Sequence, residues 1–163
     1  MFKRKLIVKV ALSSTAAIPE YHTEGSAGLD LAANLNIEPI IVADATYEKT
    51  LQSVKIKPFG RVLIKTGIKV EIPKGYELQI RPRSGLSLKS GLMVSNSPGT
   101  IDSDYRGDIG IIITNVSNKT VIINHGDRIA QAVLSKFERI TFKVVNSVEK
   151  TERGEGGFGS TGK

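Results

Sequence analysis

The chain contains no cysteine among its 163 residues. This absence excludes disulfide bonds, thiolate metal ligands and a thiol nucleophile. No apolar run is long enough to cross a membrane or to serve as a signal peptide, because the stretch after the basic N-terminus is interrupted by Lys9. We therefore expect an intracellular protein (cytoplasmic, or nuclear in a eukaryotic or viral setting) with no membrane partner.

Aromatic residues make up only 6% of the sequence and form no cluster on which nucleic-acid bases could stack. The two histidines, His22 and His125, lack metal-binding spacing, and we interpret each as a surface turn residue. No G-x-x-x-x-G-K-[ST] segment occurs, which excludes a nucleoside triphosphatase of the P-loop type. The net charge of +7 fits a polyanionic partner, but the basic residues are dispersed, so a small phosphorylated ligand fits at least as well as nucleic acid.

Alternation of apolar and polar residues dominates the rest of the chain, and this period of two is typical of half-buried strands. Short turn clusters separate the runs, which cover residues 5–10, 61–73, 76–81, 108–115, 120–123, 129–137 and 140–148. Only residues 84–90 suit a short helix, with Ser84 as the expected N-cap. The length suggests one domain, and many short strands predict an all-β fold, whether sandwich, jelly roll or barrel.

The C-terminal tail, residues 151–163, combines five glycines with Arg153, Phe158 and the Ser160-Thr161 pair. Such a segment has little apolar surface to bury and much backbone entropy to lose, so a disordered tail is one interpretation. Its backbone N–H groups, hydroxyls and guanidinium also suit a phosphate chain, and Phe158 suits the face of a base. Composition alone leaves both interpretations open.

Four further segments place small residues beside a few charged ones. In residues 25–33, Asp30 is either an edge carboxylate or a group that holds the waters of a magnesium ion. In residues 81–87, Arg83 and Ser84 form either an anion site or a capped helix with a solvated arginine. Each of these segments has an ordinary structural explanation when it is taken by itself.

Residues 96–108 hold three aspartates, Tyr105 and an arginine close together. This density indicates either an acidic turn or a site in which one aspartate acts as a general base on water, with Tyr105 as a flat wall for a sugar or base. A calcium loop is excluded because the downstream glycine and glutamate spacing is missing. Residues 126–133 read as a hairpin whose Gln131 reaches an inward polar site.

Taken in order, these segments resemble the five motifs of the trimeric dUTP diphosphatases (dUTPases). AGLDLAA at 27–33 is similar to the first motif, RPRSGLS at 81–87 to the second and NSPGTIDSDYRGDIG at 96–110 to the third. GDRIAQ at 126–131 and RGEGGFGSTG at 153–162 are similar to the fourth and fifth. Any one motif is weakly specific, whereas five in order are very specific.

The resemblance implies a jelly-roll-like distorted barrel over residues 1–150, a mobile lid over 151–163, and a homotrimer with sites shared between subunits. It implies Mg²⁺-dependent hydrolysis of dUTP, with Asp102 as the general base and Asp30 holding Mg²⁺ through water. The implied substrate-binding residues are Arg83, Ser84, Gly85, Asn96, Gly99, Thr100, Ile101, Tyr105, Gly110, Gln131, Arg153, Phe158, Gly159, Ser160 and Thr161.

Two other functions compete with this one. A dCTP deaminase or bifunctional deaminase-dUTPase would share the fold, although no glutamate stands in the deaminase context. A non-catalytic, nucleic-acid-binding or regulatory β-domain would use the positive charge and basic N-terminus. The segment 38–58 lies outside the motifs, and the part around 44–52 is longer than a compact family member needs, which fits an ordinary surface excursion or a trimer-edge role.

Overall fold

The computed structural model describes residues 6–38, 40–41, 47–50 and 52–158. These residues form thirteen strands and one short helix. The strands are β1 (Lys9–Leu12), β2 (Leu29–Ala32), β3 (Ile40–Ile41), β4 (Tyr47–Lys49), β5 (Ser53–Ile56), β6 (Arg61–Lys65), β7 (Ile68–Glu71), β8 (Tyr76–Arg81), β9 (Leu92–Val94), β10 (Gly99–Ile101), β11 (Gly110–Asn115), β12 (Val121–Asn124) and β13 (Arg128–Lys136). The helix is α1 (Ser84–Ser90). The all-β prediction is confirmed.

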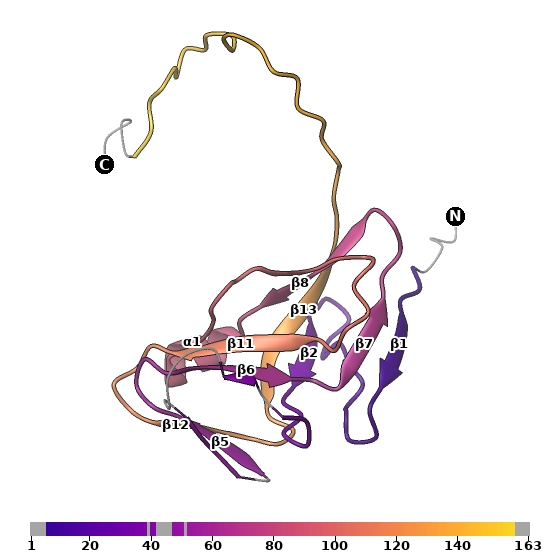
Figure 1. The fold of residues 1–163 in the computed structure, drawn as a ribbon, viewed down its shortest axis with the longest axis vertical. Coiled ribbons are helices and arrows are strands. Elements are labelled where there is room, and N and C mark those ends of the chain that lie inside the picture. Colours follow the sequence, from indigo (N-terminus) through magenta and orange to yellow (C-terminus); the bar gives the residue numbers. More distant parts are fainter. Residues whose placement is uncertain (1–5, 39, 42–46, 51, 159–163) are drawn as a thin grey trace.

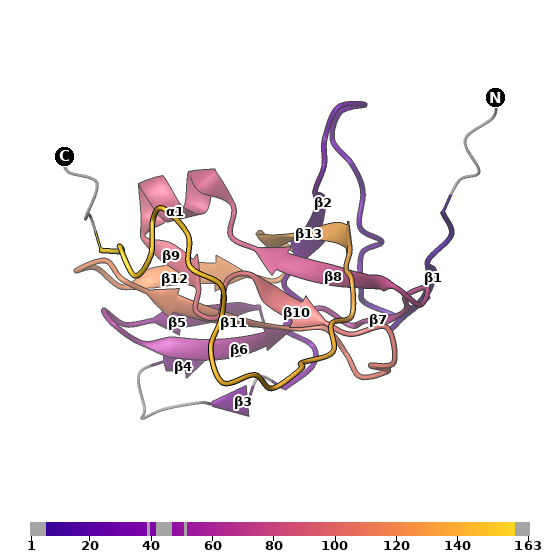
Figure 2. The same ribbon diagram turned by 90° about the horizontal axis from the view of Figure 1, so that it is seen from above.

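The strands pair into four open sheets, and all pairings among the described strands are antiparallel. Their orders are β10-β8-β13-β2, β3-β6-β11-β9, β12-β5-β4 and β1-β7. In Figure 2 the first two sheets lie as two layers, with β8 and β13 above β6 and β11. Within the described part of the chain the sheets do not close into a continuous barrel.

Alternating side chains fill the space between the layers. In β11, Ile111, Ile113 and Asn115 are buried while their neighbours are half-buried, as period two requires. Ile64 of β6 and Ile80 of β8 are likewise buried. Buried aliphatic residues from nine of the strands thus form one core, and the polar groups of the motifs remain at its margins.

The run 61–73, which the alternation suggests is continuous, is two strands in different sheets. Strand pairing is interrupted at Thr66 and Gly67, between β6 and β7. The backbone N–H groups of both residues donate to Asp108 Oδ1 at 3.2 Å. Gly67 has a φ of +74°, a conformation that strongly favours glycine. This turn transfers the chain from β6 to β7 and ties it to the segment that precedes β11.

The predicted helix is confirmed, but its predicted cap is wrong. Arg83 occupies the N-cap position with extended backbone angles (φ −95°, ψ 128°), so Ser84 is the first helical residue. No side chain caps the helix. Gly91 ends it in the left-handed conformation with φ +66°, and its N–H donates to Leu86 O and Ser87 O.

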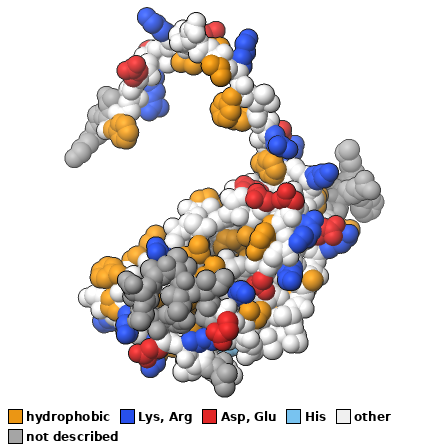
Figure 3. All heavy atoms as spheres, viewed as in Figure 1, with side chains coloured by type: hydrophobic (Ala, Val, Ile, Leu, Met, Phe, Trp, Pro, Cys, Tyr) orange, Lys and Arg blue, Asp and Glu red, His pale blue; other side chains and the backbone are white. Residues whose placement is uncertain are grey.

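The run 140–148 was predicted as a strand and is not one in the single chain. After β13, residues 138–150 form an extended arm without regular secondary structure, which curves away from the sheets (Figure 1). Ile140, Phe142, Val144 and Val148 on this arm are between 73% and 96% exposed, and Figure 3 shows hydrophobic side chains spaced along it. The arm has the pattern of a strand but no partner strand among the described residues.

Within the described ranges, no helix is long and apolar enough to span a bilayer.

Candidate active site

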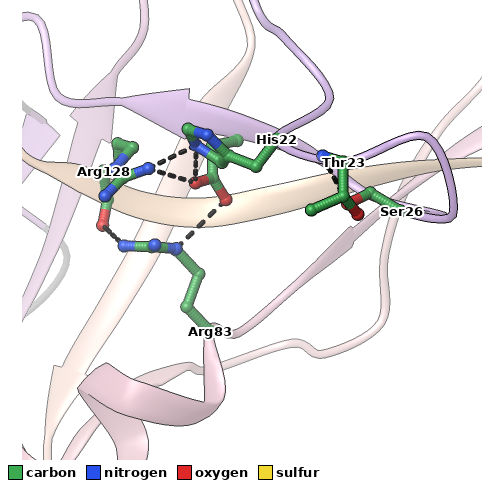
Figure 4. Close-up of polar contacts among 6 residues, drawn as sticks. His22, Thr23, Ser26, Arg83 and Arg128 are labelled. Carbon is green, nitrogen blue, oxygen red and sulfur yellow. Dashed lines mark hydrogen bonds and ion pairs between the residues drawn. The ribbon is translucent and has the colours of Figure 1, made fainter.

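Asp30 is the centre of a cluster of charged side chains. It lies in β2, opposite Gln131 of β13, and its side chain is 14% exposed. Its Oδ1 is 3.1 Å from Arg83 Nε, and its Oδ2 is 3.2 Å from Arg128 Nη1 and 2.9 Å from His22 Nε2 (Figure 4). The two guanidinium groups attract the carboxylate electrostatically, and this attraction offsets the desolvation free energy that its partial burial costs.

Arg83 is fixed at the junction of β8 and α1. Besides its contact with Asp30, its Nη1 donates to the backbone oxygen of Arg128 at 2.9 Å. The guanidinium therefore joins the second and fourth sequence motifs to the first. This link follows from the sheet order, since β13 lies between β2 and β8.

Gln131 is held by a close approach of the backbone at Gly28. Its Nε2 donates to Pro82 O at 2.9 Å. A Cβ atom added to Gly28 would lie only 2.3 Å from Gln131 Oε1, so a larger residue there would displace the Gln131 amide from this position. The predicted inward position of Gln131 agrees with this geometry.

These residues line a cavity of about 560 Å³ at the C-terminal end of β8. Arg83, Ser84, Gly85, Gln131 and Asp30 all contribute to its wall. Lys89 and Arg81 add further positive charge. Guanidinium, ammonium, hydroxyl and amide donors around an open cavity suit a polyanion such as a phosphate chain.

The third motif lies elsewhere. Gly99, Thr100 and Ile101 form β10, which pairs with β8 in a register that places Ile101 opposite Leu78. Asp102 follows β10 and is exposed, and continuing the same register places it at the level of Glu77, six residues before Arg83 along β8 and its extension. At about 3.3 Å per residue, this separates Asp102 from Arg83 by roughly 20 Å. The single chain therefore does not bring Asp102 to the cavity that holds Arg83.

The other residues of the third motif surround the β10 hairpin. Asn96 is exposed, and its Nδ2 would lie 3.1 Å from a Cβ added to Gly99, so the amide packs over that glycine. Tyr105 donates from its hydroxyl to Asp108 O at 3.0 Å and covers Gly107. Gly110 begins β11, where an added Cβ would lie 2.9 Å from Leu63 Cδ2.

Arg153 and Phe158 lie on the tail, and neither contacts the cavity at the end of β8 or the β10 hairpin. Arg153 Nε donates to Gly156 O at 2.8 Å within a local turn. Phe158 is fully exposed and has a φ of +50°, which is uncommon for a residue with a side chain. The predicted contacts of Gly159, Ser160 and Thr161 lie outside the described residues.

Two members of the cluster were missed by sequence reasoning. His22 was interpreted as a surface turn residue, yet its ring is directed at Asp30 and Arg128 (Figure 4). Arg128 was quoted within a motif but given no role. The signal for His22 was its place on a short connection into β2, just before the glycine-rich segment that carries Asp30.

The described residues contain no group of three or more His, Asp or Glu side chains that would hold a metal ion by itself. Asp30 Oδ2 is buried and accepts no aligned hydrogen bond within the described residues, although His22 Nε2 and Arg128 Nη1 lie 2.9 Å and 3.2 Å from it. A single carboxylate oxygen of this kind fits a hydrated Mg²⁺ ion, which keeps several waters and takes its other ligands from phosphates.

Comparisons with known proteins agree with this arrangement. A sequence model of the dUTPase family matches residues 44–162. The deoxyuridine 5'-triphosphate nucleotidohydrolase of Fusobacterium nucleatum subsp. nucleatum is 46% identical over 160 residues, covering 98% of this chain and 99% of the relative. The protein of the same name from Dinoroseobacter shibae is 51% identical over 146 residues, covering 90% and 88%.

Solved structures give the same result for the fold. A mutant dUTPase of Staphylococcus bacteriophage 80alpha with dUpNHpp superposes with a TM-score of 0.77 at 28% identity, covering 96% of this chain and 99% of that one. A mutant dUTPase from phage phi11 of S. aureus, described with a structural Mg(II) ion, gives 0.71 at 26% identity, covering 88% and 99%. The jelly-roll prediction is thereby confirmed. The family match, the curated relatives and the arrangement of the motifs lead to one conclusion: the chain belongs to the dUTPase family of enzymes.

Proposed function

We propose that this protein hydrolyses dUTP to dUMP and diphosphate at sites that are each completed by more than one subunit of a homotrimer. The observation that carries the proposal is the separation of Asp102 from the phosphate-binding cavity within one chain. A water attacks only when it lies within about 3–3.5 Å of the reacting phosphorus, so the base and the phosphate ligands must meet. Association of chains is the means that brings them together.

Binding of the phosphates is assigned to the cavity of β2, β8 and β13. Arg83, Ser84, Gly85 and Gln131 present donors to a triphosphate, and the arginine is already oriented by Asp30 and Arg128 O. Orientation before binding reduces the entropy lost when the substrate binds. Charge-assisted hydrogen bonds of this kind contribute about 1.5–3 kcal/mol each.

Asp102 is the proposed general base. It removes a proton from a water whose oxygen forms a bond to the α-phosphorus, while the bond from that phosphorus to the bridging oxygen breaks and diphosphate leaves. Exposure of Asp102 in the isolated chain fits a carboxylate that meets its substrate only at a subunit boundary. Uracil and deoxyribose are assigned to the β10 hairpin, through Asn96, Gly99, Thr100, Ile101, Tyr105 and Gly110.

Magnesium is the proposed cofactor, and Asp30 would hold it through a bound water. When present, the ion neutralises phosphate charge and fixes the geometry of the triphosphate. The buried Oδ2 without an aligned donor among the described residues supports this assignment. Asp30 also orients Arg83, so one carboxylate serves both the metal and the phosphate ligand.

The arm and a groove beside β1 support the homotrimer. An apolar groove of about 290 Å³ is bordered by Leu6, Val10, Ile18 and Tyr21, all of which are at least 40% exposed. Among the described strands β1 pairs only with β7, so one of its edges is available. The thirteen residues of the arm, 138–150, span up to about 45 Å when extended, which is long enough to reach another subunit. An arm from a second copy would cover this groove and bury its own apolar side chains.

Residues 151–163 are proposed to act as a separate lid on the body formed by 1–150. The tail follows the arm, so the same exchange would carry it to the site of another subunit. There Arg153, Ser160 and Thr161 would contact the γ-phosphate and Phe158 would stack on uracil. Closing the site would exclude bulk water. By this reaction the protein would lower the dUTP concentration and supply dUMP for thymidylate synthesis.

The test is diphosphate release in the presence of magnesium across dUTP, dTTP, dCTP and UTP. We expect rapid release from dUTP alone, because the hairpin is proposed to exclude the thymine methyl, the cytosine amine and the ribose 2′-hydroxyl. Ammonia release from dCTP would establish a deaminase instead. No turnover of any of the four, with salt-sensitive binding to oligonucleotides, would establish the regulatory β-domain.

Replacing Gly28 with alanine is expected to weaken nucleotide binding about tenfold, the effect of one hydrogen bond to a charged group. The added methyl group would displace Gln131, whose Oε1 would lie 2.3 Å from it. Titration calorimetry with the non-hydrolysable dUpNHpp measures the affinity. Gly25→Ala is the matched control, because a Cβ at Gly25 meets nothing within 4 Å; equal affinities for the two variants would contradict the role given to Gln131.

A further inference from the structure

Arg81 lies in the wall of the cavity assigned to the phosphates, and the proposed reaction gives it no role. It is the last residue of β8. In the sheet it lies opposite Gln131 of β13, which in turn lies opposite Asp30 of β2. Directly opposed residues of antiparallel strands direct their side chains to the same face of a sheet. The three side chains therefore form one row across the sheet, and all three line the cavity.

The side chain of Arg81 is oriented by two polar residues of its own strand. Leu78 and Ile80 are buried in the core. Glu77, Gln79 and Arg81 alternate with them and share the opposite face. Arg81 Nε and Nη2 both donate to Gln79 Oε1, at 3.2 Å and 2.6 Å. Gln79 Nε2 donates in turn to Glu77 Oε1 at 2.7 Å, so the acceptor of Arg81 is itself held in place.

Gln79 uses only one edge of the Arg81 guanidinium. Arginine has five N–H groups in a fixed planar arrangement, and the Nε and Nη2 groups that donate to Gln79 lie side by side. The N–H groups of Nη1 and the second one of Nη2 donate to no acceptor within the described ranges. Parallel N–H groups at the end of a guanidinium fit two oxygens of one phosphate group.

The positive charge of Arg81 is not offset by a carboxylate as that of Arg83 is. Arg83 Nε lies 3.1 Å from Asp30 Oδ1, and Arg128 Nη1 lies 3.2 Å from Asp30 Oδ2. In the part of the chain that the structure describes, Arg81 forms no ion pair, and its partner Gln79 is neutral. A cation without a paired carboxylate attracts a phosphate more strongly than one whose charge is already shared.

We propose that Arg81 is a further phosphate-binding residue, which contacts the triphosphate of dUTP through Nη1 and Nη2, and that Gln79 positions it. The inference rests on the proposed function, because it adds a contact to the same cavity. Gln79 holds the guanidinium before the nucleotide arrives, so less side-chain entropy is lost on binding.

The variant Arg81→Ala is expected to bind dUpNHpp about tenfold more weakly than the unsubstituted protein, the effect of one hydrogen bond to a charged group. Its affinity for deoxyuridine, which has no phosphate, is expected to stay within about twofold. Titration calorimetry in the presence of magnesium measures both. Lys74→Ala is the matched control, because it removes one positive charge from an exposed residue beside the opposite end of β8.

Two further substitutions test the geometry of the contact. Arg81→Lys keeps the charge but loses the paired N–H groups, so we expect it to remain at least about threefold weaker than arginine for dUpNHpp. Gln79→Leu removes the acceptor that orients Arg81 and is expected to weaken dUpNHpp binding about threefold. In an Arg81→Ala background, Gln79→Leu is expected to cause no further loss, because a positioning residue acts only through the group it positions.

Several results would overturn the inference. If Arg81→Ala binds dUpNHpp as tightly as Lys74→Ala does, Arg81 is no phosphate ligand. An equal loss of affinity for deoxyuridine would mean that the substitution acts through the fold, and full affinity in Arg81→Lys would mean that charge alone acts. A further loss from Gln79→Leu in the Arg81→Ala background would contradict the positioning role. The proposed function fails by a different result, in which the unsubstituted protein releases no diphosphate from dUTP.

Discussion

Asp102→Asn is expected to lower the turnover of dUTP by at least about a hundredfold, which is the lower range for loss of a general base. Asparagine has nearly the shape of aspartate but cannot take the proton of the attacking water. Binding should survive, because the proposed phosphate ligands, Arg83 and Gln131, line a separate cavity. Steady-state diphosphate release gives kcat, and dUpNHpp titration gives the affinity.

The fold should tolerate this substitution. The Asp102 side chain is exposed, and the hydrogen bond from Tyr105 N at 3.2 Å goes to its backbone oxygen. Asp104→Asn is the matched control, because Asp104 is an exposed carboxylate on the same loop. A kcat for Asp102→Asn that equals that of Asp104→Asn would mean that the base lies elsewhere.

Truncation after Thr151 is expected to remove most of the activity while leaving the fold and the proposed homotrimer intact. Loss of a single charge-assisted hydrogen bond from Arg153, about 1.5–3 kcal/mol, already lowers kcat/KM more than about tenfold. Loss of the proposed stacking by Phe158 and of the proposed exclusion of water would add to this. The body should remain folded, because residues 152–158 contribute nothing to the buried core.

The truncated protein is assayed beside one that lacks only Lys163, which lies beyond the fifth motif. Sedimentation or light scattering of both measures the oligomeric state. If the truncated protein forms the same oligomer and keeps its kcat/KM, residues 152–163 are no lid. If it dissociates, the tail stabilises the assembly and the proposed division at residue 150 is wrong.

Much of the fold could be predicted, because most strands alternate apolar residues on their core face with more polar residues on their outer face. Period-two alternation marks β8 and β11, since each packs one face on the core. The run 61–73 suggested one continuous strand, because its alternation of apolar and polar residues continues through the change of sheet at Gly67. The run 140–148 misled in another way: it has the pattern of a strand, but no described strand of the same chain pairs with it.

The site could be predicted only in part. The ordered motifs predicted the residue set, and the structure places Asp30, Arg83 and Gln131 around one cavity. The place of His22 in the cluster could not be predicted, because its contacts with Arg128 and Asp30 join positions distant in the sequence or depend on the conformation of the loop before β2. The resemblance implied sites shared between subunits, but strand patterning could not show the separation of Asp102 from Arg83, since it follows from the register of β10 on β8.

The central claim is that each site takes its base from one chain and its phosphate ligands from another. The direct test mixes Asp102→Asn chains with Arg83→Ala chains, unfolds and refolds them together, and measures diphosphate release from dUTP. Arg128 remains beside Asp30 in the Arg83→Ala chain, so its carboxylate keeps a cationic neighbour. Random assembly gives intact Asp102 and Arg83 in about a quarter of the shared sites, so we expect about a quarter of the unsubstituted activity. A mixture no more active than its two separate components would contradict the shared site.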